Sequence, residues 1–161
     1  MLIRNILEES VRKFDEVKAV KWLKKKEIME RSYGELMENV VSTRKGLLAE
    51  GFEGKHIALI GTSSVEWMES YLGIITGCTT AVPLDAALPC EDLIDLLNRS
   101  DSVALFLSPK LRPYLDAFLE NCPKLQKVWM LQEEVEDASA KVYGIGELRN
   151  AGKSASADSV C

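Results

Sequence analysis

Histidine is almost missing from this chain, with His56 the only one among 161 residues. A single histidine excludes a histidine-rich metal site and leaves one candidate for a histidine general base. No serine or cysteine near it in the sequence has the glycine-flanked pattern of a nucleophile, so we interpret it as the first residue of a buried strand. The four cysteines, Cys78, Cys90, Cys122 and Cys161, form no Cys-x-x-Cys pair. We therefore predict no metal site, and free thiols in a reducing compartment.

Long apolar runs are missing as well. None approaches the roughly 18 residues that a spanning helix needs, and residues 1–9 interrupt their apolar side chains with charge and contain no small-residue cleavage site. We expect no membrane span, no signal peptide and a cytoplasmic location. The composition, 47% hydrophobic and 28% charged, is typical of a globular domain.

An excess of positive charge is the third absence. Twenty basic side chains oppose 25 acidic ones, and the formal net charge is −5. A field of this sign repels nucleic acid and anionic membranes, so we expect no nucleic-acid partner. The run of Lys24, Lys25 and Lys26 is a local exception. It is typical of a solvated hairpin tip, and an anion or lipid contact is the alternative.

The first fifty residues predict a helix, a hairpin and a second helix. Apolar residues recur at three- and four-residue intervals at Ile3, Ile6, Leu7, Val11 and Phe14. They predict an amphipathic helix that docks on the rest of the domain. Two short segments, residues 19–23 and 27–30, flank the lysine run and predict a β-hairpin. Ser32 followed by Glu35 is a capping box, which predicts a helix that ends at Gly51.

From His56 onward, strands and helices alternate. Strands are predicted at residues 57–60, 79–82, 103–107 and 127–131, and helices at residues 63–77, 89–97 and 111–119. Ser63 and Glu66 form a second capping box at the start of the first of these helices. Short connections between parallel strands require right-handed crossovers. The predicted fold class is a layered α/β domain with a mostly parallel sheet and flanking helices, after an N-terminal helix and a short β-hairpin.

The end of the chain has a weaker pattern. Residues 142–148 predict a strand and a helical turn, and small and polar residues follow. We therefore assign residues 1–150 to the α/β domain and residues 151–161 to a linker. Gly77, between a helix end and a buried strand, is predicted to be structural and to adopt a left-handed conformation.

Few residues have a pattern that indicates chemistry. Residues 61–64 follow a strand as a phosphate loop does, but they contain one glycine and the serines cap a helix. Gly144 and Gly146 begin a dinucleotide fingerprint, but Arg149 replaces its third glycine. Asp85 follows a strand at the edge where open α/β sheets bind ligands, and a turn aspartate is the alternative. The remaining acidic candidates lie on predicted helix starts or solvent faces and are Glu8, Glu9, Glu66, Glu69, Glu91 and Asp92.

Four segments together resemble the AMP-forming acyl-adenylate ligases, which include acyl-CoA synthetases, peptide-synthetase adenylation domains and luciferases. Residues 31–36 resemble the first core motif of that family and residues 77–85 the second, while residues 51–59 and 61–67 resemble the segments between them. The matching motif positions, mainly structural, are Ser32, Tyr33, Gly34, Glu35, Leu36, Gly77, Pro83, Leu84 and Asp85. Lys55, Thr62 and the pair Ala86 and Ala87 depart from the family pattern.

The resemblance implies the N-terminal subdomain of such a ligase. The full-length enzyme would use ATP and Mg²⁺ to convert a small carboxylic acid, first of all a fatty acid, into an acyl-adenylate. It would then transfer the acyl group to CoA or to a carrier-protein phosphopantetheine. Its phosphate loop, ribose-binding aspartate and catalytic lysine have no counterpart in this chain, and in the family the loop begins after a segment resembling residues 157–161.

The resemblance therefore assigns no catalytic and no cofactor-binding residue to this chain, which alone is expected to be inactive. The residues expected at the edge of the substrate tunnel are Thr62, Ser63, Ser64 and Asp85. The expected partner is the remainder of the same polypeptide, and the face left open for it favours self-association. The alternative is a free-standing, non-catalytic α/β domain for binding or assembly.

Overall fold

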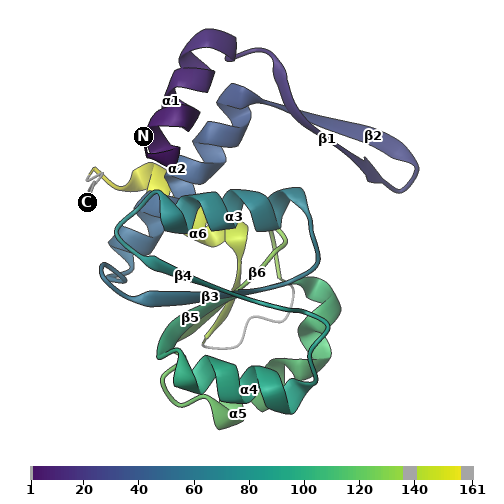
Figure 1. Ribbon diagram of the computed structural model, residues 1–161, viewed down its shortest axis with the longest axis vertical. Helices are drawn as coiled ribbons and strands as arrows, with labels where there is room; N and C mark the ends of the chain where they lie inside the picture. The colour runs from purple at the N-terminus through teal and green to yellow at the C-terminus, as the bar shows by residue number, and fades with distance from the viewer. Residues whose placement is uncertain (1, 136–140, 157–161) are drawn as a thin grey trace.

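The computed structural model describes residues 2–135 and 141–156 of the chain. A five-stranded parallel sheet with helices on both faces forms the larger part, and an N-terminal helix with a two-stranded hairpin forms the smaller part (Figure 1). This architecture confirms the predicted fold class.

The N-terminal part consists of helix α1 (Ile3–Phe14) and a hairpin of strands β1 (Lys18–Lys24) and β2 (Glu27–Ser32). Lys25 and Lys26 form the turn of the hairpin, as predicted. The ring of Phe14 lies 6.2 Å from that of Tyr33, yet no residue of α1 is buried. The expected docking of this helix is therefore limited to a contact that leaves much of its apolar stripe exposed.

Helix α2 (Tyr33–Ala49) begins at the predicted capping box. The amide of Glu35 donates to Ser32 Oγ at 3.2 Å, and the amide of Ser32 donates to the Glu35 carboxylate at 2.7 Å. That second bond lowers the pKa of Glu35, so the cap is complete at neutral pH and is lost as acid protonates the carboxylate. The chain leaves the helix at Gly51, whose φ of 81° is favourable only for glycine.

The sheet contains β3 (His56–Ile60), β4 (Thr80–Leu84), β5 (Ser102–Leu107), β6 (Lys127–Met130) and β7 (Val142–Gly144). Their order is β4-β3-β5-β6-β7, and every neighbouring pair is parallel. Pro83 has no amide hydrogen to donate, which is tolerated on an edge strand such as β4.

The helices between and after the strands are α3 (Val65–Ile75), α4 (Cys90–Arg99), the 3₁₀ helix η1 (Pro109–Tyr114), α5 (Leu115–Asn121) and α6 (Ile145–Ser154). Helices α4 and α5 cover one face of the sheet, and α2, α3 and α6 cover the other (Figure 1). Two details differ from the prediction. Ser64, and not Ser63, caps α3 by accepting from the Trp67 amide at 3.1 Å, so Glu66 closes no capping box. The predicted helix at residues 111–119 begins as a 3₁₀ turn that contains Pro113.

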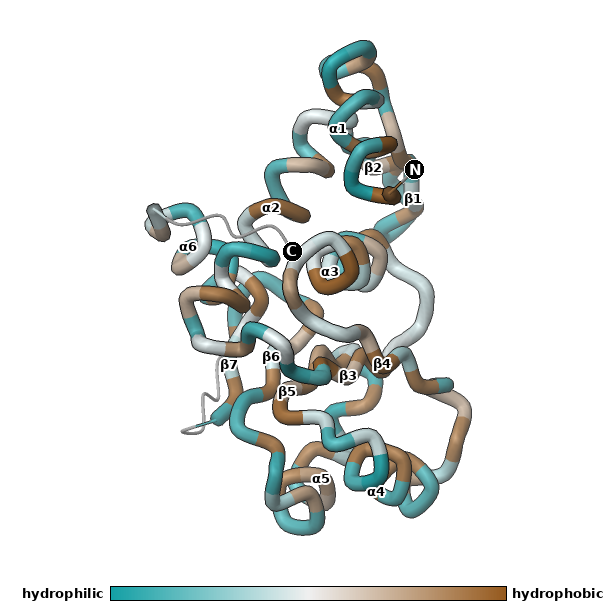
Figure 2. Tube along the Cα trace, turned by 60° about the vertical axis from the view of Figure 1, so that its left-hand side comes forward, coloured by the Kyte–Doolittle hydropathy of each residue, from teal (hydrophilic) through white to brown (hydrophobic). Residues whose placement is uncertain are grey.

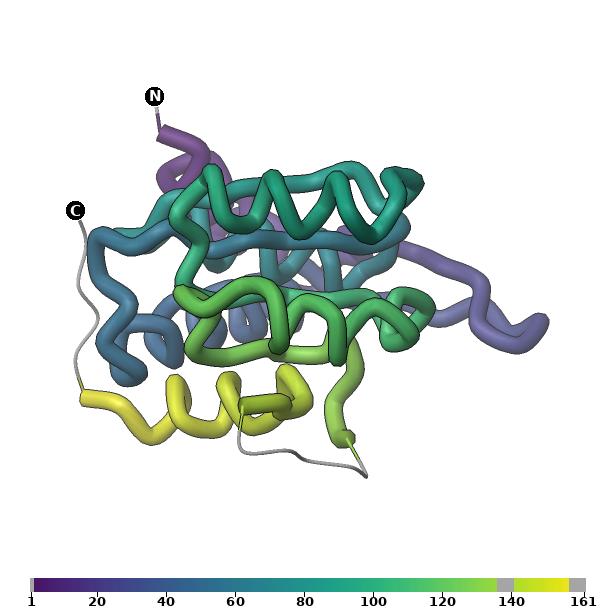
Figure 3. The backbone as a smooth tube through the Cα atoms, turned by 90° about the horizontal axis from the view of Figure 1, so that it is seen from below, coloured from purple at the N-terminus to yellow at the C-terminus, as the bar shows by residue number. Residues whose placement is uncertain are grey.

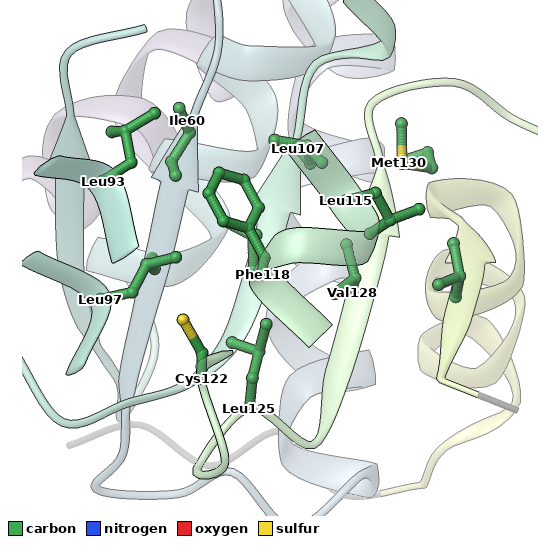
Figure 4. Close-up of a cluster of buried hydrophobic side chains, with 13 residues drawn as sticks. Ile60, Leu93, Leu97, Leu107, Leu115, Phe118, Cys122, Leu125, Val128 and Met130 are labelled. Atoms are coloured by element: carbon green, nitrogen blue, oxygen red, sulfur yellow. The ribbon is translucent and has the colours of Figure 1, made fainter. Parts of the chain in front are cut away.

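Each face of the sheet has its own hydrophobic core. Phe118, Leu93 and Leu105 belong to the cluster under α4 and α5, which Figure 4 shows in close-up. Phe106, Ile57 and Trp129 belong to the cluster under α2, α3 and α6. Adjacent residues of one strand point to opposite faces, and the central strands are accordingly mostly hydrophobic along their length (Figure 2).

Helix α6 runs past the predicted start of the linker. It extends to Ser154, so the first four residues of the predicted linker 151–161 are helical. Gly152 lies so close to α2 that a Cβ on it would overlap the Ser42 carbonyl oxygen and lie 2.8 Å from the Gly46 amide nitrogen. Helix α6 therefore packs against the domain along its length (Figure 3). The rest of the predicted linker, from residue 157, lies outside the described residues.

Gly77 does not have the left-handed conformation that the sequence predicted, because its φ is not positive. Its lack of a side chain serves another purpose. A Cβ at this position would lie 2.8 Å from Arg44 Cγ, which comes from α2 and is buried. Glycine is therefore required for the close approach of the α3–β4 connection to α2.

Substitution of Gly77 tests this interpretation. Gly77→Val is expected to lower the free energy of unfolding by about 1–3 kcal/mol, because the added atoms overpack the Arg44 side chain. Gly77→Ala adds one atom and is expected to cost less. Urea unfolding followed by circular dichroism measures both, and stabilities equal to that of the parent would contradict the crowding.

The cysteines also depart from the prediction in part. Cys90 and Cys122 are free thiols, as expected, and burial raises the pKa of both. Cys78 is disulfide-bonded, so the expectation of a free thiol is wrong at this position. Cys161 lies outside the described residues. Across residues 2–135 and 141–156, no helix combines the length and apolarity that crossing a membrane requires.

Candidate functional site

The carboxyl edge of the parallel sheet carries the polar segments that the sequence analysis selected. Residues 61–64 follow β3, and Asp85 follows β4. Because Ile60 and Leu84 pair in the parallel ladder, the two segments leave the sheet side by side. β4 lies on one side of β3, and the next strand in sequence, β5, lies on the other. Open α/β sheets bind ligands at such a switch point.

Gly61 lets three elements meet at this edge. The Ser108 amide, just after β5, donates to the Ile60 carbonyl at 2.9 Å. A Cβ on Gly61 would lie 3.0 Å from Ser108 Cβ and 3.2 Å from Trp67 Cδ1. This glycine is therefore explained by close packing and not by a phosphate-binding backbone.

Two of the predicted edge residues remain available to a ligand. The side chains of Thr62 and Ser63 are exposed, whereas Ser64 Oγ already accepts from the first turn of α3. The Asp85 side chain is exposed too, and its Oδ1 accepts from the Ala87 amide at 2.9 Å. Asp85 thus stabilises a turn, which was the alternative interpretation of this residue. Its Oδ1 is used within its own loop.

Trp67 supplies a polar group that the sequence did not indicate. Its ring stacks on Tyr71 with centroids 5.3 Å apart, and its Nε1 is buried without a hydrogen-bond acceptor among the described residues. Buried donors of this kind are uncommon in complete structures. The indole donor lies close to the carboxyl edge, since Trp67 Cδ1 is the atom that approaches Gly61.

The first motif lies apart from this edge, at the junction of the hairpin and α2. Ser32, Gly34 and Glu35 line an open hollow of about 330 Å³ together with Asp15, Glu16 and Lys18. Gly34 donates its amide to the Asp15 carbonyl at 3.0 Å, and a side chain there would overlap the Asp15 carboxylate. Leu36 is buried in the core. These motif positions therefore hold the hairpin and α1 on the domain.

A buried polar network connects the two regions. We call it the Glu69 network; it consists of Arg31, Asn39, Thr43, Glu69, Glu133 and Arg149. Glu69 was predicted to face solvent, but it is fully buried. Its Oε2 accepts from Arg149 Nη2 at 2.9 Å, and its Oε1 accepts from Asn39 Nδ2 at 3.1 Å and from Arg31 Nη1.

Arg149 carries the network onward to the strand ends. Its Nη1 lies 3.2 Å from Glu133 Oε1, just beyond β6, and its Nε lies 3.4 Å from Thr43 Oγ1. Both oxygens of Glu69 accept hydrogen bonds from other side chains, two of which are cationic, and such charge-assisted bonds are strong. The network is therefore structural. Its hydrogen-bonded partners are separated by up to 106 residues in sequence, which is why local pattern did not indicate them.

Gly144 and Gly146 lie against the chain that follows β6, near Glu133 of the Glu69 network. The amides of Ile145 and Gly146 donate to the carbonyls of Gln132 and Glu133 at 3.0 and 3.1 Å. A Cβ on Gly146 would lie 2.6 Å from the Glu133 carbonyl oxygen, and one on Gly144 would overlap it. These glycines allow β7 and α6 to approach the end of β6, which agrees with the rejection of a dinucleotide fingerprint.

His56 and the acidic residues form no catalytic or metal centre in the described part of the chain. His56 Nδ1 lies 2.6 Å from the Ser100 carbonyl oxygen at the start of β3, as expected of the first residue of a strand. No group of three histidine, cysteine or carboxylate side chains in residues 2–135 and 141–156 is placed to hold a metal ion.

Comparison with known proteins identifies relatives of this arrangement. The sequence profile described as "AMP-binding enzyme" matches residues 7–160. No curated protein sequence gives a significant match. Coronafacic acid ligase from Pectobacterium brasiliense has a similar structure, with a TM-score of 0.82 at 20% identity over 93% of this chain and 29% of that one.

Two further solved structures share the fold. The N-terminal domain of FACL13 from Mycobacterium tuberculosis gives a TM-score of 0.71 at 19% identity, over 98% of this chain and 37% of that one. The anthranilate CoA ligase AuaEII, in complex with anthranoyl-AMP, gives 0.69 at 19% identity, over 78% and 24%. This chain thus spans between about a quarter and somewhat over a third of the length of these structures.

Proposed function

Because the chain belongs to the AMP-binding enzyme family and corresponds to the N-terminal subdomain of an AMP-forming ligase, we propose that the whole protein is an acid–thiol ligase. It activates a carboxylic acid, a fatty acid first of all, as an acyl-adenylate and transfers the acyl group to CoA or to a carrier-protein phosphopantetheine. The observation that carries this proposal is the family match over residues 7–160. A cytoplasmic location is part of the proposal.

The residues that the structure describes do not fit the nucleotide and its metal. Phosphoryl chemistry needs converging amides or cations and a carboxylate-held Mg²⁺, and the described residues contain no such metal-ligand group. Gly61, the glycine in the expected place, is required for packing. We therefore assign ATP and Mg²⁺ binding to the remainder of the polypeptide and derive no catalytic step from this chain.

The chain's own contribution is the proposed edge of the acid-binding tunnel. Thr62 and Ser63 are exposed at the switch point of the sheet, and Asp85 stands beside them. The buried Trp67 Nε1 donor lies at the same edge and lacks an acceptor among the described residues. A segment of the remaining polypeptide that docks there would supply one. A free-standing binding or assembly domain is the second candidate. It is supported by the two hydrophobic cores and by the Glu69 network, all of which are formed by residues of this chain alone.

Pyrophosphate release tests the proposal. The 161-residue chain, mixed with ATP, Mg²⁺ and a panel of fatty and aromatic acids, is expected to show none above background. The longer protein encoded by the same gene is expected to release pyrophosphate in the presence of its acid, and Thr62→Val in that protein tests the tunnel edge through its KM for the acid. Acid-dependent pyrophosphate release by the 161-residue chain would contradict the assignment of ATP and Mg²⁺ binding to the remainder of the polypeptide. A stop codon directly after Cys161 would favour the free-standing domain.

A further inference from the structure

The far end of the β1–β2 hairpin exposes an apolar pair. Leu23 and Ile28 are cross-strand partners in the hairpin ladder, and their side chains are 72% and 71% exposed. They are the two most exposed large hydrophobic residues of the described chain. Single exposed apolar side chains are common on protein surfaces, whereas adjacent ones mark interaction sites. The pairing of Leu23 with Ile28 therefore indicates a contact surface.

Basic side chains surround this pair. Residues 18–32 contain six basic and two acidic residues, in a chain whose formal net charge is −5. Glu30 is paired with Lys21 at 2.6 Å, and Glu27 stands opposite Lys24 in the ladder. Lys25 and Lys26 form the turn itself and have no acidic residue opposite them in the ladder. The tip is therefore a cationic end on an anionic molecule.

The turn keeps these lysines at a conformational cost. Lys25 and Lys26 have φ of 47° and 73°, the left-handed region that a two-residue hairpin turn of this kind requires. Asn-Gly is the common sequence for such turns because it adopts these angles with little strain. Two lysines at these positions strain the backbone of the turn. Their presence despite this strain is consistent with a role for their positive charge.

The hairpin extends away from the sheet and its helices (Figures 1 and 3). Its base is held by Arg31, which reaches Glu69 and lies over the Trp22 ring at 5.4 Å. Beyond this anchor, residues 23–30 are exposed on both strands. A partner can therefore reach the tip without approaching the acidic remainder of the chain.

We propose that the hairpin tip, residues 21–30, is a contact site for an anionic lipid surface. Leu23 and Ile28 enter the headgroup region, and Lys24, Lys25 and Lys26 bind the lipid phosphates around them. The overall negative charge repels the rest of the molecule from such a surface, so binding is tip-first. This inference does not depend on the proposed enzymatic function.

Charge and size favour a lipid surface over the other occupants. A second copy would bring two lysine clusters together, which is unfavourable. A stable protein interface requires about 20–30 residues from each side, more than the ten residues of this tip provide. A lipid surface needs neither shape complementarity nor a large area.

Vesicle co-sedimentation of the 161-residue chain tests the proposal. We expect binding to vesicles of mixed phosphatidylcholine and phosphatidylglycerol, no binding to phosphatidylcholine alone, and weakening as salt is raised. Replacing Lys24, Lys25 and Lys26 with glutamine is expected to weaken binding on the order of a hundredfold, from about fivefold for each lysine. The matched control replaces three exposed lysines far from the hairpin in sequence, Lys55, Lys110 and Lys141, with glutamine. It removes the same charge from the molecule and is expected to leave binding unchanged or only slightly weaker.

The apolar pair is tested in the same assay. Leu23→Ser with Ile28→Ser is expected to reduce binding at least tenfold. Leu2→Ser, at a residue that is 65% exposed and precedes α1 at its N-terminal end, is expected to leave binding unchanged. Equal losses in the hairpin and control variants would overturn the proposal. So would equal binding to neutral vesicles, or hairpin-dependent self-association in sedimentation velocity without vesicle binding. Circular dichroism of each variant confirms that the fold is intact.

Discussion

Replacing Glu69 with glutamine is expected to lower the free energy of unfolding by about 3–5 kcal/mol, the range found when one partner of a buried ion pair is removed. Glutamine has nearly the same shape, so no cavity forms. It leaves the buried Arg149 guanidinium without its carboxylate, and its amide group places a new donor among the three donors that now meet Glu69. Urea unfolding followed by circular dichroism measures the loss.

The control is a surface glutamate that also pairs with a basic residue of α6. Glu38 of α2 pairs with Lys153 of α6 at 2.8 Å, with side chains 63% and 51% exposed. Glu38→Gln is expected to cost less than about 1 kcal/mol, since exposed ion pairs contribute little. If Glu69→Gln and Glu38→Gln were equally stable, the buried Glu69 network would contribute no more to stability than an exposed ion pair.

Replacing Gly152 with valine is expected to cost about 3 kcal/mol, at the upper end of the usual range for overpacking. The obstacle is backbone, because the new Cβ would overlap the Ser42 carbonyl oxygen and lie 2.8 Å from the Gly46 amide nitrogen. Helix α6 would have to move away from α2. That movement would also displace the buried Arg149, which lies one turn earlier on α6.

Asn150→Val is the matched control for this prediction. Asn150 is exposed on the same helix, so the change alters helix propensity without crowding and is expected to change the free energy of unfolding by less than about 0.5 kcal/mol. Melts of the two variants distinguish a packed helix from a linker. If Gly152→Val were as stable as Asn150→Val, residues 151–154 would behave as the linker that the sequence alone predicted.

The elements of the fold were predictable because local rules determine them. Short branched apolar runs predicted β3, β5 and β6, and the reciprocal bonds of Ser32 and Glu35 fixed the start of α2. The glycines were harder to interpret. Gly51 has a positive φ, which a helix end indicates, but Gly77 and Gly152 are needed for contacts with residues 33 and more than 100 positions away. Such contacts have no local pattern.

The candidate site was predictable to the same extent. Parallel topology alone places residues 61–64 and Asp85 at one edge, and the ladder confirms that placement. The roles of Glu69 and Arg149 were not predictable, because a glutamate on an amphipathic helix normally faces solvent. Their partners come from the hairpin, α2 and the end of β6, which only the tertiary structure brings together.

The packing of α2 on α6 also determines when folding can finish during synthesis. Helix α2 leaves the ribosome about 100 residues before α6, and until then Gly46, Leu47 and the Trp129 side of the sheet lack their cover. At about 5–20 residues per second, this interval lasts roughly 5–20 seconds. During this interval the residues that complete both cores are still being made, Val128 and Met130 for one face and Ile145 and Leu148 for the other. A nascent chain would therefore hold both faces of the sheet open until α6 emerges.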